Sequence, residues 1–387
     1  MNGESLTIII GGDFVPTNSN KTLFQNNDIN GLIGNRCKEL LDSSDFTVIN
    51  LETPLTDNLS PIMKWGPNLG ASVESVSMIK KLGVDVACIA NNHIMDQGVK
   101  GLESTMNALD KYNIQYVGAG MSQKDSSKVV SRHIKGKTIS IYAFCENEFS
   151  TLNTDGIGAN PLDVFVTFHQ IKAAKENCDI LIVLFHGGIE EYRYPTPRMR
   201  KIAQNAIDNG ADVFICQHSH CIGTYEQYKE KNIIYGQGNF IFDEENNEFW
   251  NSGMLLKFTI GEKINVDFIP IIKNRCGIRL AENNDCRLIL ESFHKRSNEI
   301  KTPGYIEKRL EEYSRERIYK LLKMFGGKLT GNILYRGLDK VTHNALTKKI
   351  YNKKYIACIL DYMRCESLND VIISGCTEMI NSNGDQL

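Results

Sequence analysis

Short apolar runs that lead directly into histidine limit most strongly what this chain can fold into. Residues 180–185 (ILIVLF) and 213–216 (VFIC) are too short for helices and are bounded by polar or glycine residues, which predicts two buried β-strands. His186 follows the first run, and His218 and His220 follow the second after one glutamine. Three imidazoles therefore leave the same edge of one predicted sheet, where rigid strands hold ligating side chains in place.

Three earlier apolar runs are also predicted to be strands with polar side chains at their ends. These strands and the side chains that follow them are 6–10 with Asp13, 46–52 with Glu52, and 84–90 with Asn92 and His93. Helices are predicted between them at 28–43 and 72–82. Carboxylate, amide and imidazole groups suit Mn²⁺, Fe or Zn²⁺. We therefore expect the five strand ends to converge, as parallel neighbours in a common sheet, on a pocket for one or two cations.

Length and composition place the chain among ordinary soluble proteins. With 387 residues it is long enough for one large domain and an appendage, and a net charge of −2 gives no global attraction to nucleic acid or membrane. The sequence has no run of 18 apolar residues and no basic segment followed by a long apolar one. Its 11 cysteines are dispersed and often lie within apolar runs, which is typical of free thiols. We therefore expect a cytoplasmic protein without disulfides.

The C-terminal part of the chain differs from the rest in charge and in periodicity. Residues 295–354 contain 16 Lys and Arg against 6 Asp and Glu, a net charge of +10, so the rest of the chain carries −12. Helices are predicted at 305–325, 340–364 and 368–380. The predicted organisation is a catalytic domain at 1–280 and a basic helical extension at 281–387. The basic helices are interpreted either as a solvated face or as a surface for an anionic polymer, nucleic acid or lipid.

The motifs together identify the chain as similar to a known family. The segments that carry the resemblance are GGD (11–13), NLETPLT (50–56), ANNHIMDQG (90–98), FHGGIEEY (185–192), GADVFICQHSH (210–220) and YGQGNFIFD (235–243). In order and spacing they resemble the calcineurin-like metallophosphoesterases, and more closely the CapA family of capsule and poly-γ-glutamate synthesis proteins. The resemblance covers roughly residues 6 to 272. It implies an α/β fold, a four-layer β-sandwich flanked by helices, followed by the C-terminal helical extension.

The strand runs after these motifs fit two packed sheets. Runs at 253–260 and 264–272 alternate partly between apolar and polar residues, which predicts strands of a second sheet. The expected architecture is therefore two mixed sheets packed together, with helices outside.

The resemblance also implies roles for individual residues. One metal ion would be held by Asp13, Glu52 and His220, and a second by Glu52, Asn92, His186 and His218, with Glu52 bridging. His93 would protonate a leaving oxygen or stabilise charge on phosphate. Classical metallophosphoesterases have a histidine two residues after the first aspartate, where this chain has Val15, and an aspartate where it has Glu52. The first metal site is therefore expected to be weak, exchangeable or empty.

Further candidates lie in loops next to the motifs. Lys64, Arg193 and Arg198 could supply positive charge for a phosphate, or be solvated surface charges. Asp96 could orient His93 or a metal ligand, and Glu190 could have such a role or face water. Asn239 is a candidate substrate contact, within a loop where Gly236 and Gly238 permit close backbone approach or form a turn.

Cysteines flank the histidine pair and suggest a second kind of site. Cys216 and Cys221 give a C-x-H-x-H-C pattern that would suit zinc, but Cys216 lies within the predicted strand. We interpret Cys216 as a core residue.

These observations favour a metal-dependent phosphomonoesterase or phosphodiesterase, by resemblance linked to capsule, surface polysaccharide or poly-γ-glutamate synthesis. Two divalent ions would supply the chemistry, so no protein nucleophile is required. The expected partners are a phosphorylated small molecule or polymer intermediate and capsule synthesis proteins. Two alternatives are a non-catalytic metal-binding subunit of a polymer synthesis complex and a nuclease-like phosphodiesterase. A basic groove leading from the site would favour the nuclease.

Overall fold

The computed structural model describes residues 5–243, 247–326, 330–364, 372–373 and 376. By contacts the chain divides into two compact units, Met1–Ile306 and Glu307–Leu387, and each is described by itself. The helix predicted at 368–380 lies outside the described residues except for residues 372, 373 and 376, which are helical.

The first sheet of the first unit is built around the N-terminal strand. It has eight strands in the order β16-β15-β14-β1-β2-β3-β4, with β13 also paired to β1. The strands are β1 (Leu6–Phe14), β2 (Phe46–Leu51), β3 (Val86–Cys88), β4 (Gln115–Val117), β13 (Asn239–Ile241), β14 (Ser252–Ile260), β15 (Ile264–Asn274) and β16 (Gly277–Leu280). Strands β1 to β4 are parallel, so their carboxyl ends lie at one edge.

The second sheet contains the histidine strands. Its order is β11-β12-β10-β9-β7-β6. The strands are β6 (Val130–Ile134), β7 (Lys137–Cys145), β9 (Ile180–His186), β10 (Val213–Gln217), β11 (Tyr225–Tyr228) and β12 (Lys231–Ile234). Strand β9 lies between β7 and β10 and is parallel to both, which explains its continuous apolar sequence. A separate pair, β5 (Ala119–Gly120) and β8 (Gly158–Ala159), completes the strands of the described chain.

The prediction that the runs at 253–260 and 264–272 belong to the second sheet is wrong. Strand β14 pairs antiparallel with β1, and β15 pairs with β14, so both lie in the first sheet. Strand β1 has β2 on one side only, and β14 satisfies the backbone groups on its other side. Apolar alternation predicted the strands but carries no information on which edge they join.

Alternation along the strands divides the apolar side chains between three cores. On β1, Ile8 and Ile10 lie in the core between the two sheets, whereas Ile9 lies in the core under the outer helices. A third core separates the second sheet from its own helices and includes Phe185 and Phe214. Each fully buried side chain of this size contributes roughly 1.5–3 kcal/mol through removal from water. The predicted four-layer α/β sandwich is confirmed.

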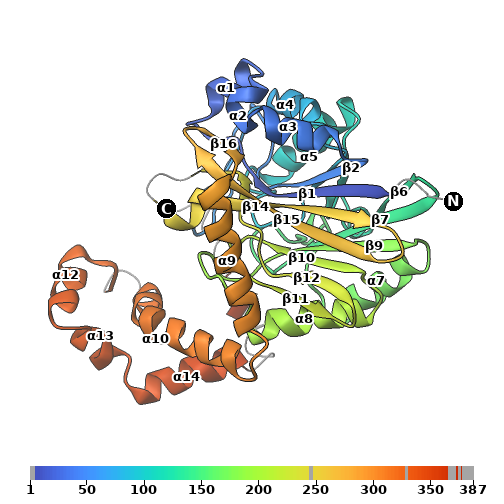
Figure 1. The fold of residues 1–387 in the computed structure, drawn as a ribbon. Helices are drawn as coiled ribbons and strands as arrows, with labels where there is room; N and C mark the ends of the chain where they lie inside the picture. The colour runs from blue at the N-terminus through green and yellow to red at the C-terminus, as the bar shows by residue number, and fades with distance from the viewer. Residues whose placement is uncertain (1–4, 244–246, 327–329, 365–371, 374–375, 377–387) are drawn as a thin grey trace. The chain divides into compact units, whose positions relative to one another are not determined.

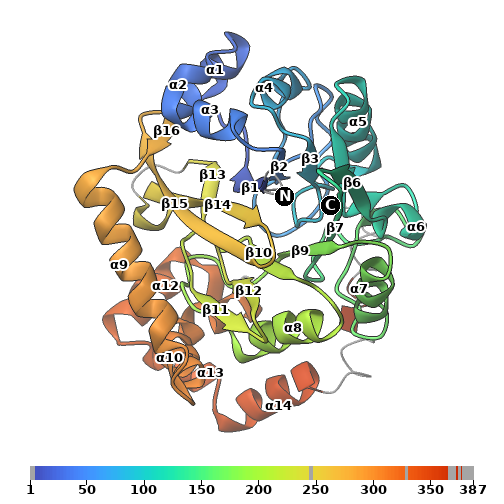
Figure 2. The same ribbon diagram turned by 45° about the vertical axis from the view of Figure 1, so that its right-hand side comes forward.

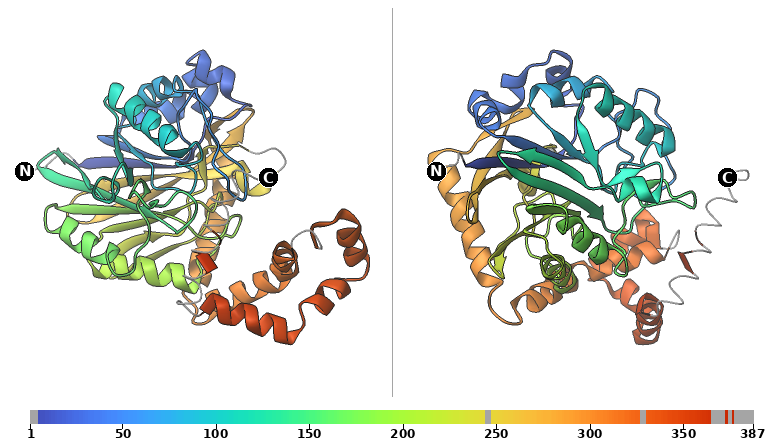
Figure 3. Two further views of the ribbon diagram at one scale, coloured as in Figure 1. Left: turned by 180° about the vertical axis from the view of Figure 1, so that it is seen from behind. Right: turned by 90° about the vertical axis from the view of Figure 1, so that its right-hand side faces the viewer.

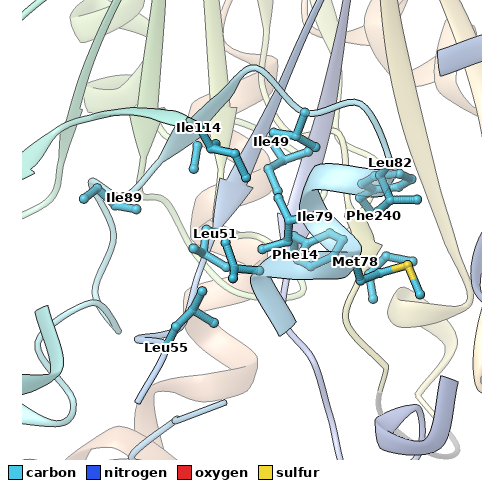
Figure 4. Close-up of a cluster of buried hydrophobic side chains, with 14 of the residues drawn as sticks. Phe14, Ile49, Leu51, Leu55, Met78, Ile79, Leu82, Ile89, Ile114 and Phe240 are labelled. Carbon is cyan, nitrogen blue, oxygen red and sulfur yellow. The ribbon is translucent and has the colours of Figure 1, made fainter. Parts of the chain in front are cut away.

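Helices cover both outer faces of the sandwich. Figure 1 shows α1 to α5 on one side of the sheets and α7 and α8 on the other, and Figure 3 shows the same layers from behind. The helices are α1 (Lys21–Gln25), α2 (Ile29–Ile33), α3 (Asn35–Asp42), α4 (Ser75–Lys81), α5 (Gly98–Lys111), α6 (Gln123–Ser126), α7 (Thr167–Lys175) and α8 (Pro197–Asp208). Figure 4 shows Met78 and Ile79 of α4 packed with Phe14 and Ile49 of the first sheet.

The helix predicted at 28–43 is two helices. Gly34 ends α2 and precedes α3 with a φ of 70°, a left-handed conformation that breaks the helix and that glycine adopts readily. The remaining helices of the first unit are the 3₁₀ turn η1 (Glu248–Asn251) and α9 (Asn283–Glu299).

The first unit extends beyond the predicted domain boundary at residue 280. Helix α9 lies along β15 and β11, as Figure 2 shows, and its Phe293 is fully buried in the core between the sheets. This packing places the division between the units at Ile306 and Glu307. The division into functional domains at 280 stays a prediction.

The second unit is helical wherever it has regular structure in the described residues. It contains α10 (Tyr305–Phe325), which the division cuts in its first turn, and α12 (Ile333–Val341), α13 (Ala345–Ile350) and α14 (Lys353–Arg364). The segment predicted as one helix at 340–364 is therefore broken into shorter ones. Within the part of the chain that the structure describes, no helix has the length and apolarity needed to span a membrane.

Candidate metal centre

The carboxyl ends of strands from both sheets meet at one buried group of polar side chains. Asp13 lies near the end of β1, Glu52 directly after β2, His186 at the end of β9, and His218 directly after β10. The expectation of a single common sheet is wrong, because β1 and β2 belong to the first sheet and β9 and β10 to the second. The side chains still converge because the sheets pack face to face with these strand ends together.

Glycine lets the backbone close around this group. A Cβ on Gly12 would lie 2.0 Å from the carbonyl oxygen of Gly238, so no side chain fits there. The close approach lets β13 pair with β1 and sets Asn239 opposite Asp13.

The predicted ligands form two overlapping clusters. One consists of Asp13, Glu52 and His220, and the other of Glu52, His186 and His218; in each, one ligating atom per residue lies within 4.8 Å of the others. All five side chains are buried. The Nε2 atom of His186 lies 3.1 Å from Nδ1 of His218 and 3.0 Å from Oδ1 of Asn92. The geometry therefore brings together all six predicted metal ligands, with Glu52 shared.

Glu52 has the environment expected of a metal ligand. Its side chain is 0% exposed, and among the described residues no donor reaches either carboxylate oxygen with hydrogen-bond geometry. The Nε2 atom of His186 lies 3.2 Å from Oε1 as an ion-pair contact only. A buried carboxylate that accepts no hydrogen bond is unfavourable, and coordination of a metal ion satisfies such oxygens. The residues present therefore fit a divalent cation.

Mutual interactions set the ionisation of the group. Burial raises the pKa of Asp13, but hydrogen bonding and charge from His220, the charge of His186 and the hydrogen bond from Asn50 together lower it overall. Burial lowers the pKa of His220, yet Glu52 and Asp13 raise it to about 9. The pKa of His218 lies well below its ordinary value because of burial and then the neighbouring His186. The centre therefore contains an ionised Asp13 carboxylate, and His218 is neutral and able to ligate a metal ion.

The backbone of the histidine loop is strained. His218 and His220 have φ values of 101° and 51°, in the left-handed region that costs such residues about 1–3 kcal/mol each. The surroundings hold this conformation: the His220 ring lies 4.4 Å from the Trp250 ring, and the His218 ring lies 4.8 Å from that of His186. Such strain clusters at functional sites.

A second buried network adjoins the centre through His93. Nδ1 of His93 lies 2.6 Å from Oδ2 of Asp96, which also accepts a 2.6 Å hydrogen bond from the amide of Leu69. Lys64 pairs with the other oxygen of Asp96, and its Nζ lies 3.3 Å from Nδ1 of His93. The predicted partnership of Asp96 and His93 is present. Lys64 is the counterion of Asp96, with a side chain that is 4% exposed, and its role as a substrate contact stays a prediction.

The other candidates occupy three different environments. Oδ1 of Asn239 lies 2.9 Å from Nδ1 of His220, so it orients that ring. Glu190 is exposed and forms a third candidate ligand cluster with His218 and His220. Arg193 donates to the carbonyl of Ile222 and lies over the Phe249 ring.

Arg198 and the two cysteines lie apart from the ligand clusters. Arg198 is exposed in the first turn of α8. Cys216 and Cys221 belong to none of the candidate ligand clusters in the described chain, and Cys216 lies in the core beneath α8. The residues of the C-x-H-x-H-C pattern therefore do not form one ligand cluster there, and the assignment of Cys216 to the core agrees with its position.

Sequence reasoning missed the amides that hold the ligands. Nδ2 of Asn50 donates to Oδ1 of Asp13 at 2.7 Å and lies 3.2 Å from Nδ1 of His186. Nδ2 of Asn91 donates to the side chain of Asn50 and to the carbonyl of Leu51. The available signal was the alternation of β2, which places Asn50 among apolar residues where an amide requires partners.

Comparisons with known proteins identify a family that the sequence matches. The sequence model of the family described as bacterial capsule synthesis protein PGA_cap matches residues 7–244. The chain is 33% identical over 216 residues to the capsule biosynthesis protein CapA of Bacillus anthracis, a match covering 53% of this chain and 52% of that protein. It is 34% identical over 209 residues to the PGA biosynthesis protein CapA of Bacillus subtilis strain 168, covering 52% and 54%. The chain thus spans about half the length of the curated relatives it matches.

One similar solved structure is described as a novel phosphatase of Mycoplasma pneumoniae. It is 16% identical and has a TM-score of 0.45, covering 70% of this chain and 95% of the other.

Proposed function

Because the chain belongs to the PGA_cap family of bacterial capsule synthesis proteins, we propose that it is a metal-dependent phosphoesterase. Its substrate is a phosphorylated intermediate in the synthesis of capsule polysaccharide or poly-γ-glutamate. The link to capsule polymers rests on what the two CapA relatives are described to do. The cytoplasmic location predicted from the cysteines is part of the proposal, and cell fractionation tests it.

The observation that carries the proposal is the carboxylate of Glu52, buried and without a hydrogen bond in the described chain, at the overlap of two ligand clusters. Asp13, Glu52 and His220 would hold one divalent ion. Glu52, Asn92, His186 and His218 would hold the other. When bound, such ions lower the pKa of a bound water toward neutrality and neutralise charge on phosphoryl oxygens.

His93 is proposed as the proton donor to the leaving oxygen. The carboxylate of Asp96 accepts from Nδ1 of His93, which fixes the ring and leaves Nε2 as the atom that exchanges protons. Lys64 pairs with the other oxygen of Asp96 and balances the charge of that carboxylate. A positioned acid of this kind contributes roughly 10²–10⁴-fold to rate.

Hydrolysis assays on metal-stripped and reloaded protein test the proposal. The protein is treated with EDTA, reloaded with Mn²⁺, Fe²⁺ or Zn²⁺, and assayed on aryl phosphate monoesters and diesters and on sugar phosphates. We expect activity to disappear with EDTA and return with metal. His93→Ala should lose rate while retaining metal, and His133→Ala, at an exposed histidine of β6, is the matched control.

Two outcomes contradict the proposal. Full activity in EDTA removes the metal from the mechanism. Metal binding without hydrolysis of any ester leaves a non-catalytic metal-binding subunit of a polymer synthesis complex as the function.

A further inference from the structure

Two arginines from distant parts of the chain meet at one carbonyl group beside the candidate metal centre. Nη1 of Arg193 donates to the oxygen of Ile222 at 3.2 Å, and Nη2 of Arg296, on α9, donates to the same oxygen at 3.0 Å. Nε of Arg296 also donates to the carbonyl of Gly223 at 3.2 Å. Two like charges are thus held next to each other by neutral acceptors.

Neither guanidinium has a carboxylate partner within the residues that the structure describes. The other contacts of Arg193 and Arg296 are the Phe249 ring, 4.8 Å from Cζ of Arg193, and the hydroxyl of Ser292, 2.6 Å from Nη1 of Arg296. Glu299, one turn further along α9, accepts instead from the Tyr194 hydroxyl at 2.7 Å.

The unbalanced charge is reflected in the ionisation of Arg296. Burial, and then the charge of Arg193, lowers the pKa of Arg296 to about 10, although the charge of Glu299 acts in the opposite direction. Partly buried like charges without a directly paired carboxylate are unfavourable, and a bound anion would relieve this.

The arginine pair adjoins the candidate metal centre through two sets of contacts. Ile222 lies two residues beyond His220 in the chain. Phe249, beneath Arg193, precedes Trp250, whose ring lies 4.4 Å from that of His220. The loop that carries Arg193 is also tied to the histidine loop, because the amide of Glu191 donates to the carbonyl of Ser219 at 2.9 Å.

We propose that Arg193 and Arg296 form a subsite for an oxyanion, a carboxylate or phosphate, that the substrate carries in addition to the phosphate being hydrolysed. This inference rests on the proposed phosphoesterase function for its meaning. Guanidinium groups match the planar, two-oxygen geometry of such anions. The substrate is therefore a polyanion, and esters with a neutral leaving group lack one of its recognition elements.

Anion binding to metal-free protein tests the subsite independently of hydrolysis. Inorganic phosphate and glutarate are titrated by calorimetry into the EDTA-treated full chain, its Arg193→Gln and Arg296→Gln variants, and Arg132→Gln, a matched control at an exposed arginine of β6. We expect saturable binding of one or both anions, weakened at least about tenfold in both subsite variants and unchanged in the control. The anion that binds more tightly shows whether the second anionic group of the substrate is a carboxylate or a phosphate.

The Arg193→Gln variant decides the outcome if Arg296→Gln lowers the Tm, since Arg296 also holds α9 to the 222–223 carbonyls. Absence of saturable binding, or binding unchanged in Arg193→Gln, overturns the subsite.

A kinetic measurement then links the subsite to substrate recognition. On metal-loaded protein, Arg193→Gln should raise the KM for 3-carboxyphenyl phosphate at least about fivefold more than the KM for phenyl phosphate, because only the first carries a second anionic group. Equal effects on both esters contradict the subsite. A protein inactive on both esters contradicts the phosphoesterase proposal, while the calorimetric result still tests the arginine pair.

Discussion

Replacing Asp96 with asparagine removes the negative partner of Lys64. Among the lysine–carboxylate pairs of the described structure, this is the one in which both side chains are almost fully buried. The side chains of Lys64 and Asp96 are 4% and 0% exposed. Removing one partner of a buried ion pair costs roughly 3–5 kcal/mol, because the other charge is left uncompensated. Asparagine keeps one oxygen that can accept from His93 or the Leu69 amide, so we expect the lower end, about 3 kcal/mol.

Chemical denaturation of the metal-free protein measures this cost. Urea unfolding followed by circular dichroism should give a lower midpoint for Asp96→Asn with an unchanged m-value. Lys64→Met removes the positive charge that Asp96→Asn leaves unpaired. The loss of stability in the double variant should therefore be smaller than the sum of the losses in the two single variants, by at least about 1 kcal/mol.

Two results would refute the reasoning. A cost for Asp96→Asn below about 0.5 kcal/mol, typical of a surface substitution, would mean that the Lys64–Asp96 pair is not buried in solution. Strict additivity of the two substitutions would mean that the charges do not interact.

Three further predictions concern the candidate centre. Glu52→Gln should abolish the stabilisation that bound metal gives the wild type, which is about 2.7 kcal/mol when the metal concentration is 100 times the Kd. Thermal melts with and without Mn²⁺ measure this stabilisation, and a variant that metal stabilises as much as the wild type contradicts the prediction. His93→Ala should lower kcat by roughly 10²–10⁴ without changing metal content, and loss of metal would instead assign His93 to ligation. In metal-free protein, His220 has a pKa raised to about 9, so its stabilising contribution is full below an unfolded pKa of about 6.5 and is lost as pH rises to about 9. The Tm difference between the EDTA-treated wild type and His220→Gln should therefore shrink between these pH values, and a constant difference would show that the ring is not held protonated.

Much of the fold and the ligand set could be predicted because both follow local rules. An apolar run as short as 180–185, bounded by polar residues, is typical of a buried strand, and a histidine at its end is then expected at a sheet edge. The strand ends predicted a pocket for one or two cations, and the resemblance to the CapA family supplied the six predicted ligands, which the structure brings together.

What could not be predicted depends on contacts between distant segments. The sequence of β14 indicates a strand but not that it pairs with β1. Lys64 looked like a free loop charge because nothing nearby in the sequence shows that Asp96 faces it. Arg296 gave no signal at all, since its role depends on α9 packing back onto the 222–223 loop.

Elemental analysis of the purified protein tests the central claim, that Glu52 and its neighbours form a metal site. The account predicts about two equivalents of Mn, Fe or Zn per chain, or about one if the site of Asp13, Glu52 and His220 exchanges its metal. The Glu52→Gln variant should hold well under half of the wild-type metal content. A wild-type protein that stays metal-free after incubation with each ion and desalting, or a Glu52→Gln variant that binds as much metal as the wild type, would contradict it.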